Sequence, residues 1–334
     1  MVRLLLPLLL LALGLAGPAA AQGVEARRAA VQATLERAPA CAQLGDAYWE
    51  IGDRNGRLAA GQRGGGITAD QPILIASASK WLWGAYVAER QNGAPTAADI
   101  AALTMSSGYT GLNPLRCQGR VADCRGDGRD MTKSGRFYYD GGHAQQQATS
   151  FGLGTLDGPA LAVEMRRLLG SDLQFTFRSP QPAGGVIMAP AAYGQFLRKL
   201  VAGQLKLSGL LGSHAVCTLP GECRTALKSP FGRNWHYSLH HWVEDAAGDD
   251  GAVSSAGAFG FYPWISADRA LWGILARKDS HARAGQASAI CGALLRKAWL
   301  AGAEQTGGAT PVAAAQRGHP VRDALRQRML DRGR

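Results

Sequence analysis

The chain has 334 residues, of which 46% are hydrophobic, and its 36 Lys and Arg residues against 25 Asp and Glu residues give a formal net charge of +11 at pH 7. This length and apolar content allow one large domain or two closely packed ones. The positive charges are scattered and accompany no nucleic-acid-binding motif, so we interpret them as solvated surface and expect no nucleic-acid partner.

The first 21 residues predict a secretory signal peptide. Arg3 precedes an apolar run from Leu4 to Ala16, and three consecutive alanines end at Ala21. This run is too short to span a membrane well, and no later stretch of the sequence is long and apolar enough to do so. We therefore expect cleavage after Ala21 and a secreted or periplasmic protein whose mature chain has no transmembrane segment.

A helix and a hairpin are predicted next. Residues 24–37 place Val31 and Leu35 on one helical face. Residues 47–51 and 57–61 have the pattern of two strands joined at Asn55-Gly56, a pair typical of tight hairpin turns.

Residues 73–90 are the central element of the sequence. A short apolar stretch leads to a helix that begins near Ser77 and ends before Asn92-Gly93. Its residues, which include Trp81 and Trp83, leave almost no polar face, so the helix should be buried on most sides.

Ser77 and Lys80 lie one helical turn apart on the same face of this helix, with about 5–6 Å between their Cβ atoms. An amine desolvated there could accept the serine proton, and the free N–H groups at the helix start could stabilise an oxyanion. The alternative is that Ser77 is only a helix cap and Lys80 a first-turn residue that reaches solvent. The Ser-x-x-Lys spacing alone does not decide between the two.

The remaining elements follow in chain order. Residues 96–182 are helical or irregular, with a helix at 161–169, and a second helix is predicted at 193–205. Strand patterns return at 235–243, 258–265 and 270–276, and an amphipathic helix covers 282–300.

This order predicts an α/β (α+β) fold. An antiparallel sheet of about five strands would come from residues 45–70 and 232–300, with the first and last helices on one face. Residues 71–231 would form a mostly helical lobe within one domain that spans 22–304. Residues 305–334 are rich in Gly, Ala and Pro and then in Arg, which predicts a flexible basic tail.

Six cysteines in an exported chain predict three disulfides. Two pairs each enclose a short loop with turn residues, and the remaining two cysteines are then left for each other, although six cysteines allow 15 connectivities. The expected bonds are Cys117–Cys124, Cys217–Cys223 and Cys41–Cys291.

Five motifs occur in an order that resembles the class C β-lactamase-related serine hydrolases, which include penicillin-binding proteins, esterases and 6-aminohexanoate-dimer hydrolases. They are Ser77–Lys80, Leu103–Gly108, Phe137–Gly141, Ala183–Gly185 and Ser255–Pro263. Each motif alone is weak evidence for this family, whereas five motifs in the family's order are strong evidence. The resemblance runs from about Tyr48 to about Leu295, and it implies the β-lactamase/DD-peptidase (transpeptidase-like) fold without a cofactor.

The resemblance implies roles for individual residues. Ser77 would be the acylated nucleophile and Lys80 its proton partner. Tyr139 would pass the proton to the leaving group; Tyr138 is a competitor, and the register after Phe137 favours Tyr139. Gly257 would allow close backbone approach, and the N–H groups of Ser77 and Ala258 would form the oxyanion hole.

Two departures from the family pattern bear on the substrate. Gly141 stands where the family has an asparagine that contacts the substrate, and Ser255-Ala256-Gly257 replaces the Lys/His-Thr-Gly box, which removes the usual anchor for a substrate carboxylate. We therefore expect hydrolysis of a small-molecule ester or amide rather than cleavage of a β-lactam or a D-alanyl peptide.

Several histidines suggest other chemistry. His143, two residues beyond Gly141, could line the pocket. His236 and His240 would share one face of the predicted strand, but no third ligand is suitably spaced, so we predict no metal site.

Three hypotheses follow. The first is an exported serine hydrolase that works through an acyl-enzyme. The second is a peptidoglycan-directed D-alanyl peptidase or β-lactamase with a cell-wall peptide substrate. The third is a non-catalytic binding or regulatory protein of the same fold. The sequence does not predict the oligomeric state.

Overall fold

The computed structural model describes residues 18–113, 117, 119–126 and 128–307. Residues 1–17 of the predicted signal peptide and residues 308–334 of the predicted tail lie outside the described residues. Helix α1 (Pro18–Arg37) begins earlier than the sequence pattern predicts and includes the expected cleavage site after Ala21.

The helices divide into an N- and C-terminal pair and a central group. The pair is α1 and α8 (Ala284–Ala301), with the short α2 (Pro39–Ala42) after α1. The central group consists of α3 (Ser79–Arg90), α4 (Ala97–Leu103), α5 (Gly142–Ala148), α6 (Gly158–Leu169) and α7 (Pro190–Val201), with the short helical turns η1 (Ala76–Ala78), η2 (Val121–Cys124), η3 (Thr149–Leu153) and η4 (Lys206–Leu210).

The largest sheet has eight strands, all paired antiparallel, in the order β2-β1-β13-β12-β11-β10-β9-β7. Their bounds are β1 (Ala47–Asp53), β2 (Gly56–Arg63), β7 (Val216–Cys217), β9 (His236–Tyr237), β10 (Trp242–Val243), β11 (Val253–Ser254), β12 (Tyr262–Ile265) and β13 (Leu271–Ala276). Two smaller sheets pair β3 (Ile73–Leu74), β6 (Val186–Met188) and β5 (Phe175–Phe177), and β4 (Phe137–Tyr138) with β8 (Ala226–Lys228).

Three of the predictions for these elements are wrong in detail. The sheet has eight strands rather than about five, because β7 and β11 were not predicted and the predicted strand at 235–243 is two strands, β9 and β10. Residues 235–243 form a hairpin of β9 and β10, not one strand, and His240 lies in its turn with a φ of 63°. His236 and His240 therefore do not share a strand face. Residues 258–261 form a turn before β12.

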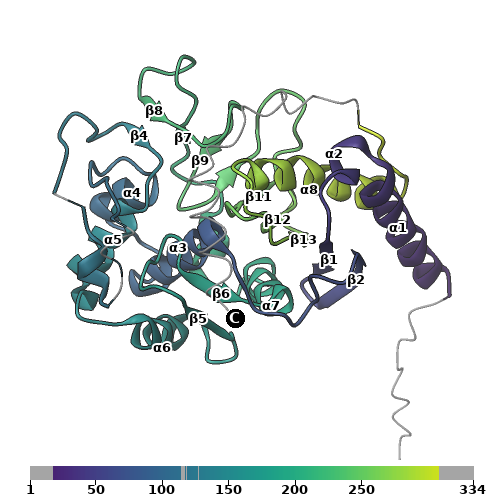
Figure 1. Cartoon of the computed structure of the whole chain (residues 1–334), viewed down its shortest axis with the longest axis horizontal. Coiled ribbons are helices and arrows are strands. Elements are labelled where there is room, and N and C mark those ends of the chain that lie inside the picture. Colours follow the sequence, from purple (N-terminus) through teal and green to yellow (C-terminus); the bar gives the residue numbers. More distant parts are fainter. Residues whose placement is uncertain (1–17, 114–116, 118, 127, 308–334) are drawn as a thin grey trace, which may run out of the picture.

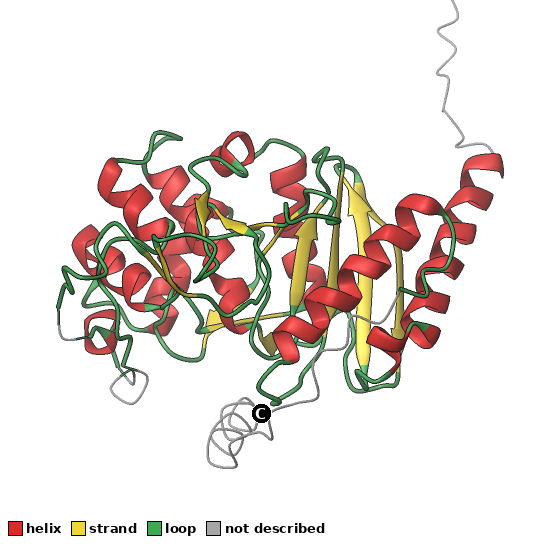
Figure 2. Ribbon diagram, turned by 90° about the horizontal axis from the view of Figure 1, so that it is seen from above, coloured by secondary structure: helices red, strands yellow, loops and turns green. Residues whose placement is uncertain are grey.

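Both faces of the large sheet are covered, as Figures 1 and 2 show. Along β1, Trp49 and Ile51 point into a core shared with α1 and α8, while Tyr48 points into a core shared with α3 and α7. Successive residues of a strand face opposite sides, so one strand supplies both cores. The helical lobe with α4, α5 and α6 lies beyond α3, at the side away from α1 (Figure 1).

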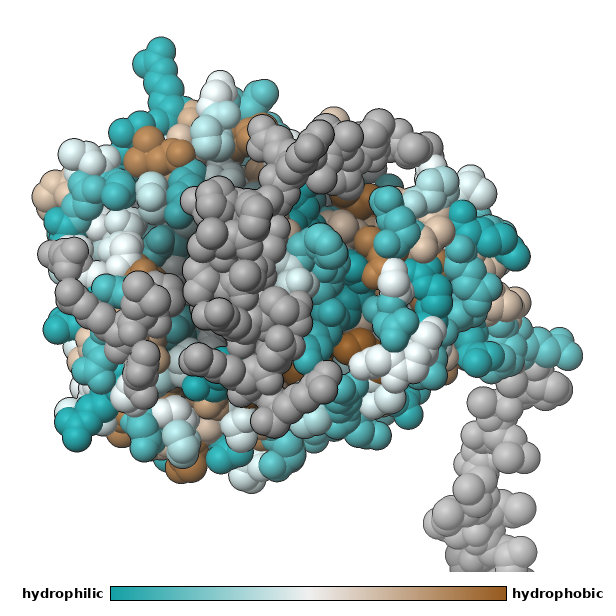
Figure 3. Space-filling model, viewed as in Figure 1, coloured by the Kyte–Doolittle hydropathy of each residue, from teal (hydrophilic) through white to brown (hydrophobic). Residues whose placement is uncertain are grey.

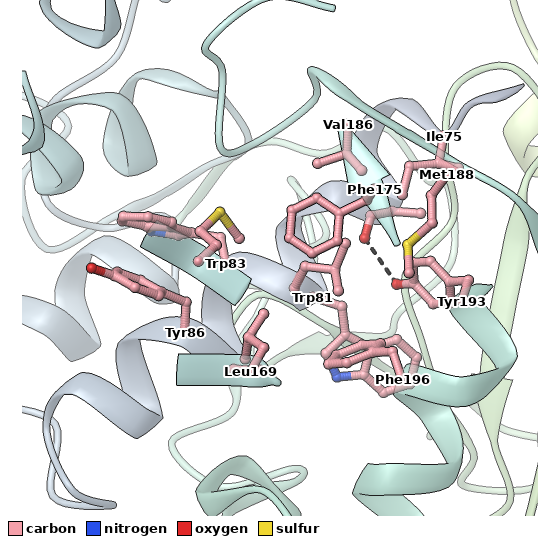
Figure 4. Packing of buried hydrophobic residues seen from close by; sticks show 14 of the residues in the cluster. Ile75, Trp81, Trp83, Tyr86, Leu169, Phe175, Val186, Met188, Tyr193 and Phe196 are labelled. Carbon is pink, nitrogen blue, oxygen red and sulfur yellow. Dashed lines mark hydrogen bonds between the residues drawn. The ribbon is translucent and has the colours of Figure 1, made fainter. Parts of the chain in front are cut away.

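Helix α3 is the centre of the molecule. Its residues from Ser79 to Ala88 are all buried. The ring of Trp81 lies 6.4 Å from that of Phe196, and the Tyr193 hydroxyl donates a hydrogen bond of 2.9 Å to the Ala78 carbonyl, drawn as a dashed line in Figure 4. This packing fixes the junction of η1 and α3, where Ser77 and Lys80 lie.

The structure forms the three expected disulfides, Cys41–Cys291, Cys117–Cys124 and Cys217–Cys223. The first joins α2 to α8 and so ties the N-terminal region to the last helix. The other two close short loops.

The surface is largely polar on the face shown in Figure 3, where hydrophobic residues of the described chain appear in small, separate groups. Within the described ranges, no helix has both the length and the apolar character needed to cross a membrane.

Candidate active site

Ser77 lies in η1, the tight turn between β3 and α3. The preceding Ala76 has a φ of 47°, in the left-handed region that non-glycine residues occupy at a cost of about 1–3 kcal/mol, often at functional sites. The buried Ser79 side chain holds this turn, because its hydroxyl donates to the Ala76 carbonyl at 2.6 Å and accepts from the Val186 N–H at 3.2 Å. The turn leaves Ser77 partly exposed.

Lys80 is buried, with 4% of its surface exposed, and its Nζ lies 3.0 Å from Ser77 Oγ. The amine also donates to the Ala183 carbonyl at 2.7 Å. Burial lowers the pKa of Lys80 to about 7, although the nearby Asp140 carboxylate acts in the opposite direction. Near neutral pH a large share of Lys80 is therefore uncharged and able to accept a proton.

Tyr139 completes this group. Its ring centroid lies 4.9 Å from Lys80 Nζ, and the Ser77 side chain is near enough to oppose part of the rise in its pKa. Burial raises the pKa of Tyr139 to about 12, so the phenol keeps its proton at neutral pH. Tyr138 lies on the other side of the chain, where the Nζ atoms of Lys133 and Lys228 are 4.6 and 4.7 Å from its ring.

The segment after β11 runs against the serine turn. Ser255 Oγ donates to the Ser77 carbonyl at 3.3 Å. A Cβ on Gly257 would lie 2.1 Å from the Ile75 carbonyl oxygen, so this approach requires glycine. Within the described part of the chain, no backbone carbonyl accepts a hydrogen bond from the N–H of Ser77 or of Ala258. Neither N–H group is therefore committed to a backbone partner among the described residues.

His143 is buried beside this group, and Gly141 is partly exposed and packs against Leu112. A Cβ on Gly141 would lie 2.7 Å from Leu112 Cδ2, so Leu112 occupies the space that a side chain there would need. His143 is 1% exposed, with Nδ1 2.7 Å from Ser107 Oγ and Nε2 2.9 Å from the Tyr138 carbonyl oxygen. The prediction that His143 lines the pocket is therefore wrong.

The contacts of His143 define its protonation. The Tyr138 carbonyl can only accept, so Nε2 carries the hydrogen and Nδ1 accepts from the Ser107 hydroxyl. Burial lowers the pKa of His143 to about 4, which keeps the ring neutral. His143 thus ties the residue before Tyr139 to the 103–108 turn.

A cavity of about 150 Å³ opens beside Ser77 and Tyr139. One further wall is the predicted segment Ala256–Ala258, and the others are the loop after β8 and the start of α8, which the sequence did not single out as parts of a site. The full lining is Ser77, Tyr139, Pro230, Phe231, Ala256, Gly257, Ala258, Ala282, Arg283, Gly285 and Gln286.

The other histidines that the structure describes form no group suited to a metal ion. His240 is buried with Nδ1 3.2 Å from the Lys80 carbonyl oxygen, and His241 Nε2 accepts from the Gly212 N–H at 2.9 Å. Across residues 18–113, 117, 119–126 and 128–307, no group of three or more His, Cys, Asp or Glu side chains could hold a metal ion.

No family model matches the chain, and no curated protein matches it by sequence. Solved structures match it by fold. EstCE1, a hydrolase with promiscuous acyltransferase activity, has a TM-score of 0.58 at 12% identity over 84% of this chain and 99% of its own. A Bacteroides dorei protein assigned as a β-lactamase has a TM-score of 0.57 at 17% identity over 76% and 93%.

A third match is simvastatin synthase, LovD, from Aspergillus terreus, with a TM-score of 0.52 at 14% identity over 85% of this chain and 97% of its own. These similarities show that the chain has the β-lactamase-like fold that the sequence motifs imply.

Proposed function

We propose that this chain, which has the fold of the β-lactamase-related serine hydrolases, is itself a serine hydrolase that cleaves an ester or amide bond through an acyl-enzyme. The observation that best supports this proposal is the pairing of Ser77 Oγ with the buried Lys80 amine at 3.0 Å. Burial favours the uncharged form of this amine, and an uncharged amine can activate the hydroxyl as a nucleophile.

In the acylation step, uncharged Lys80 accepts the Ser77 proton as Oγ attacks the substrate carbonyl carbon. The developing oxyanion is bound by the N–H groups of Ser77 and Ala258. Tyr139 donates its proton to the leaving alcohol or amine and regains one from the Lys80 ammonium. The leaving group departs, and the acyl group remains on Ser77.

Deacylation repeats these steps with water in place of the leaving group. Uncharged Lys80 accepts a proton from the water, by way of Tyr139, as the water attacks the acyl carbonyl, and the Lys80 ammonium returns that proton to Ser77 Oγ when the acid is released. Lys80 and Tyr139 then return to their original protonation states.

An ester or amide substrate agrees better with this site than a β-lactam or a D-alanyl peptide. Ala256 stands beside the cavity where the family box has a threonine, and Ser255 is occupied by its contact with the Ser77 carbonyl. Leu112 fills the space beside Gly141. A fluorescent penicillin that acylates wild-type protein, and not Ser77→Ala, would instead support the peptidoglycan-directed alternative.

Export is part of the proposal. Three disulfides suit an oxidising compartment such as the periplasm or the extracellular space. We expect N-terminal sequencing of the protein recovered from the periplasm or medium to begin at Gln22, and recovery of an uncleaved cytoplasmic chain would contradict export.

Labelling by a fluorophosphonate tests the nucleophile. We expect intact-mass analysis to show one adduct on the wild-type protein and none on Ser77→Ala. The exposed Ser171 gives a matched control, because Ser171→Ala should label like the wild type. Equal labelling of Ser77→Ala would overturn the assignment, and absence of Ser77-dependent ester turnover would support the non-catalytic alternative.

A further inference from the structure

The cavity beside Ser77 is small. Its volume of about 150 Å³ is close to that of a protein cavity that holds one benzene molecule. Ser77 and Tyr139 border it, while Pro230, Phe231 and Ala282 contribute apolar wall.

The walls of this cavity are braced. Phe231 is 6% exposed, and its ring lies 5.1 Å from Trp235 and 4.9 Å from Trp242. Trp242 in turn stacks on Tyr139, with ring centroids 5.5 Å apart. Phe231 therefore cannot move outward without disturbing a packed aromatic group, and close-packed interiors yield little to added volume.

The wall formed by α8 is braced as well. A Cβ on Gly285 would lie 2.7 Å from the Gly257 carbonyl oxygen, so the first turn of the helix rests directly on the segment that carries Ala258. Outward movement of this wall would break contact with the oxyanion segment.

The position of Tyr139 indicates which part of the substrate, the acyl group or the leaving group, occupies the cavity. In the proposed function, Tyr139 protonates the leaving atom, and Tyr139 lines the cavity whereas Lys80 does not. We infer that the alcohol or amine leaving group occupies this cavity, that it is no larger than about one aromatic ring, and that Phe231 and Ala282 set this limit. The inference rests on the proposed function and adds the class of substrate, namely esters or amides with a small leaving group.

Two series of esters separate this inference from the proposed function. The first keeps the acetyl group and enlarges the alcohol from methyl to butyl, benzyl and naphthylmethyl. The second keeps the methyl alcohol and lengthens the acyl chain. Proton release measures hydrolysis without a chromogenic leaving group.

We expect kcat/KM to fall at least about tenfold from the benzyl to the naphthylmethyl acetate, since misfit in a pocket is discriminated by about 10–200-fold. The acyl series should show no comparable fall in kcat/KM. A sharp fall in kcat/KM in the acyl series alone, or no sharp fall in either series, would overturn the inference and leave the proposed function in place. Absence of any hydrolysis above the Ser77→Ala background would contradict both.

Variants of the two walls test the named residues, with the ratio of rates on bulky and methyl acetates as the readout. Phe231→Ala should raise the naphthylmethyl-to-methyl ratio about tenfold, and Ala282→Phe, at an exposed position, should lower the benzyl-to-methyl ratio by a similar factor. A ratio is insensitive to a fraction of misfolded protein. Val163→Phe, on the exposed face of α6, is the control and should leave both ratios unchanged. Unchanged ratios in both wall variants would overturn the inference.

Discussion

Lys80 can accept the Ser77 proton only when its amine is uncharged. Burial lowers its pKa to about 7, whereas Tyr139, with a pKa raised to about 12, remains protonated over the same range. Because kcat/KM reports the ionisations of the free enzyme, we expect it to rise with pH through about 7 and then to level off. Initial rates on an uncharged ester, measured from acid to mildly alkaline pH, would show this rise as the acid limb of the pH profile.

A substitution at Asp140 tests whether Lys80 is the group that causes the acid limb. Its negative charge favours the protonated form of Lys80, so Asp140→Asn should lower the pKa of Lys80 and move the midpoint of the limb to lower pH. The asparagine keeps an oxygen for the N–H groups of Gly111 and Leu112, which Asp140 accepts at 3.0 and 3.1 Å. The exposed Asp172→Asn is the control. An unchanged or raised midpoint would show that the limb does not belong to Lys80.

In the proposed reaction we expect His143 to act through the position of Tyr139. Its bonds to Ser107 and to the Tyr138 carbonyl hold the backbone beside Tyr139, and a displacement of about 1 Å can cost about 10²-fold in rate. We expect His143→Ala to lower kcat on alkyl esters by up to about that factor. Nitrophenyl esters should be much less affected, because nitrophenolate leaves without being protonated.

A merely structural role for His143 would lower both rates alike. The side chain of His143→Gln retains an N–H donor that can reach the Tyr138 carbonyl, so this variant should recover part of the alkyl-ester rate. Parallel loss on both ester types, without recovery by glutamine, would contradict the positioning role.

At the scale of elements, the turn after β11 and the turn before α3 meet at Gly257. A methyl group at this position would lie 2.1 Å from the Ile75 carbonyl oxygen, and the clash is with backbone. Gly257→Ala should therefore separate the Ala258 N–H from Ser77 and lower kcat by about 10²–10³-fold, the usual cost of losing one oxyanion donor. The measurement is single-turnover acylation by a nitrophenyl ester.

The control for Gly257→Ala is Gly209→Ala in η4, where an added Cβ meets nothing within 4 Å. It should keep full activity. Far-UV circular dichroism of Gly257→Ala should match the wild type, since the clash is confined to one turn. Retained activity in Gly257→Ala would remove Ala258 from the proposed oxyanion hole.

The sequence predicts the helices and strands correctly where the local residue pattern indicates them. The β1–β2 hairpin follows from Asn55-Gly56, and α3 and α8 follow from their apolar patterns. The β9–β10 hairpin was missed because its turn is made by His240 at a φ of 63°, without the glycine or asparagine that usually marks such turns. Strands such as β3, β4 and β11 have only two residues each, so long-range pairing rather than local pattern creates them.

The candidate site divides in the same way. The Ser77 and Lys80 side chains were predictable, because helical spacing alone places them together. Phe231 and Ala282 were not, because they reach the cavity from a loop and a helix start far apart in the chain. His143 was misplaced for a related reason, since burial depends on the packing of α5 against neighbouring turns and not on distance along the sequence from Gly141.

At the scale of the whole molecule, the two ends of the domain pack together. Helices α1 and α8 share one core on the sheet, and Val31, Cys41, Cys291 and Leu295 all belong to it. Helix α3, which carries Lys80, lies in the other core, on the opposite side of the sheet. The sheet beside the site is therefore packed by α1 and α8 on one face and by α3 on the other, and the first turn of α8 also lines the cavity.

The disulfides allow the contribution of the domain ends to stability to be measured. Cys41–Cys291 closes a loop with a sequence separation of 250, and Cys217–Cys223 one of 6. The loss of chain entropy in the unfolded state grows with loop size, so removing the first bond should cost about 5 kcal/mol and removing the second about 2 kcal/mol. Urea unfolding of Cys41→Ala/Cys291→Ala and of Cys217→Ala/Cys223→Ala would give both values.

Since Cys41 and Cys291 are fully buried, lost packing adds to the cost of removing their disulfide. Equal costs, or the reverse order, would show that the link between the domain ends is not what holds the sheet and its two cores together.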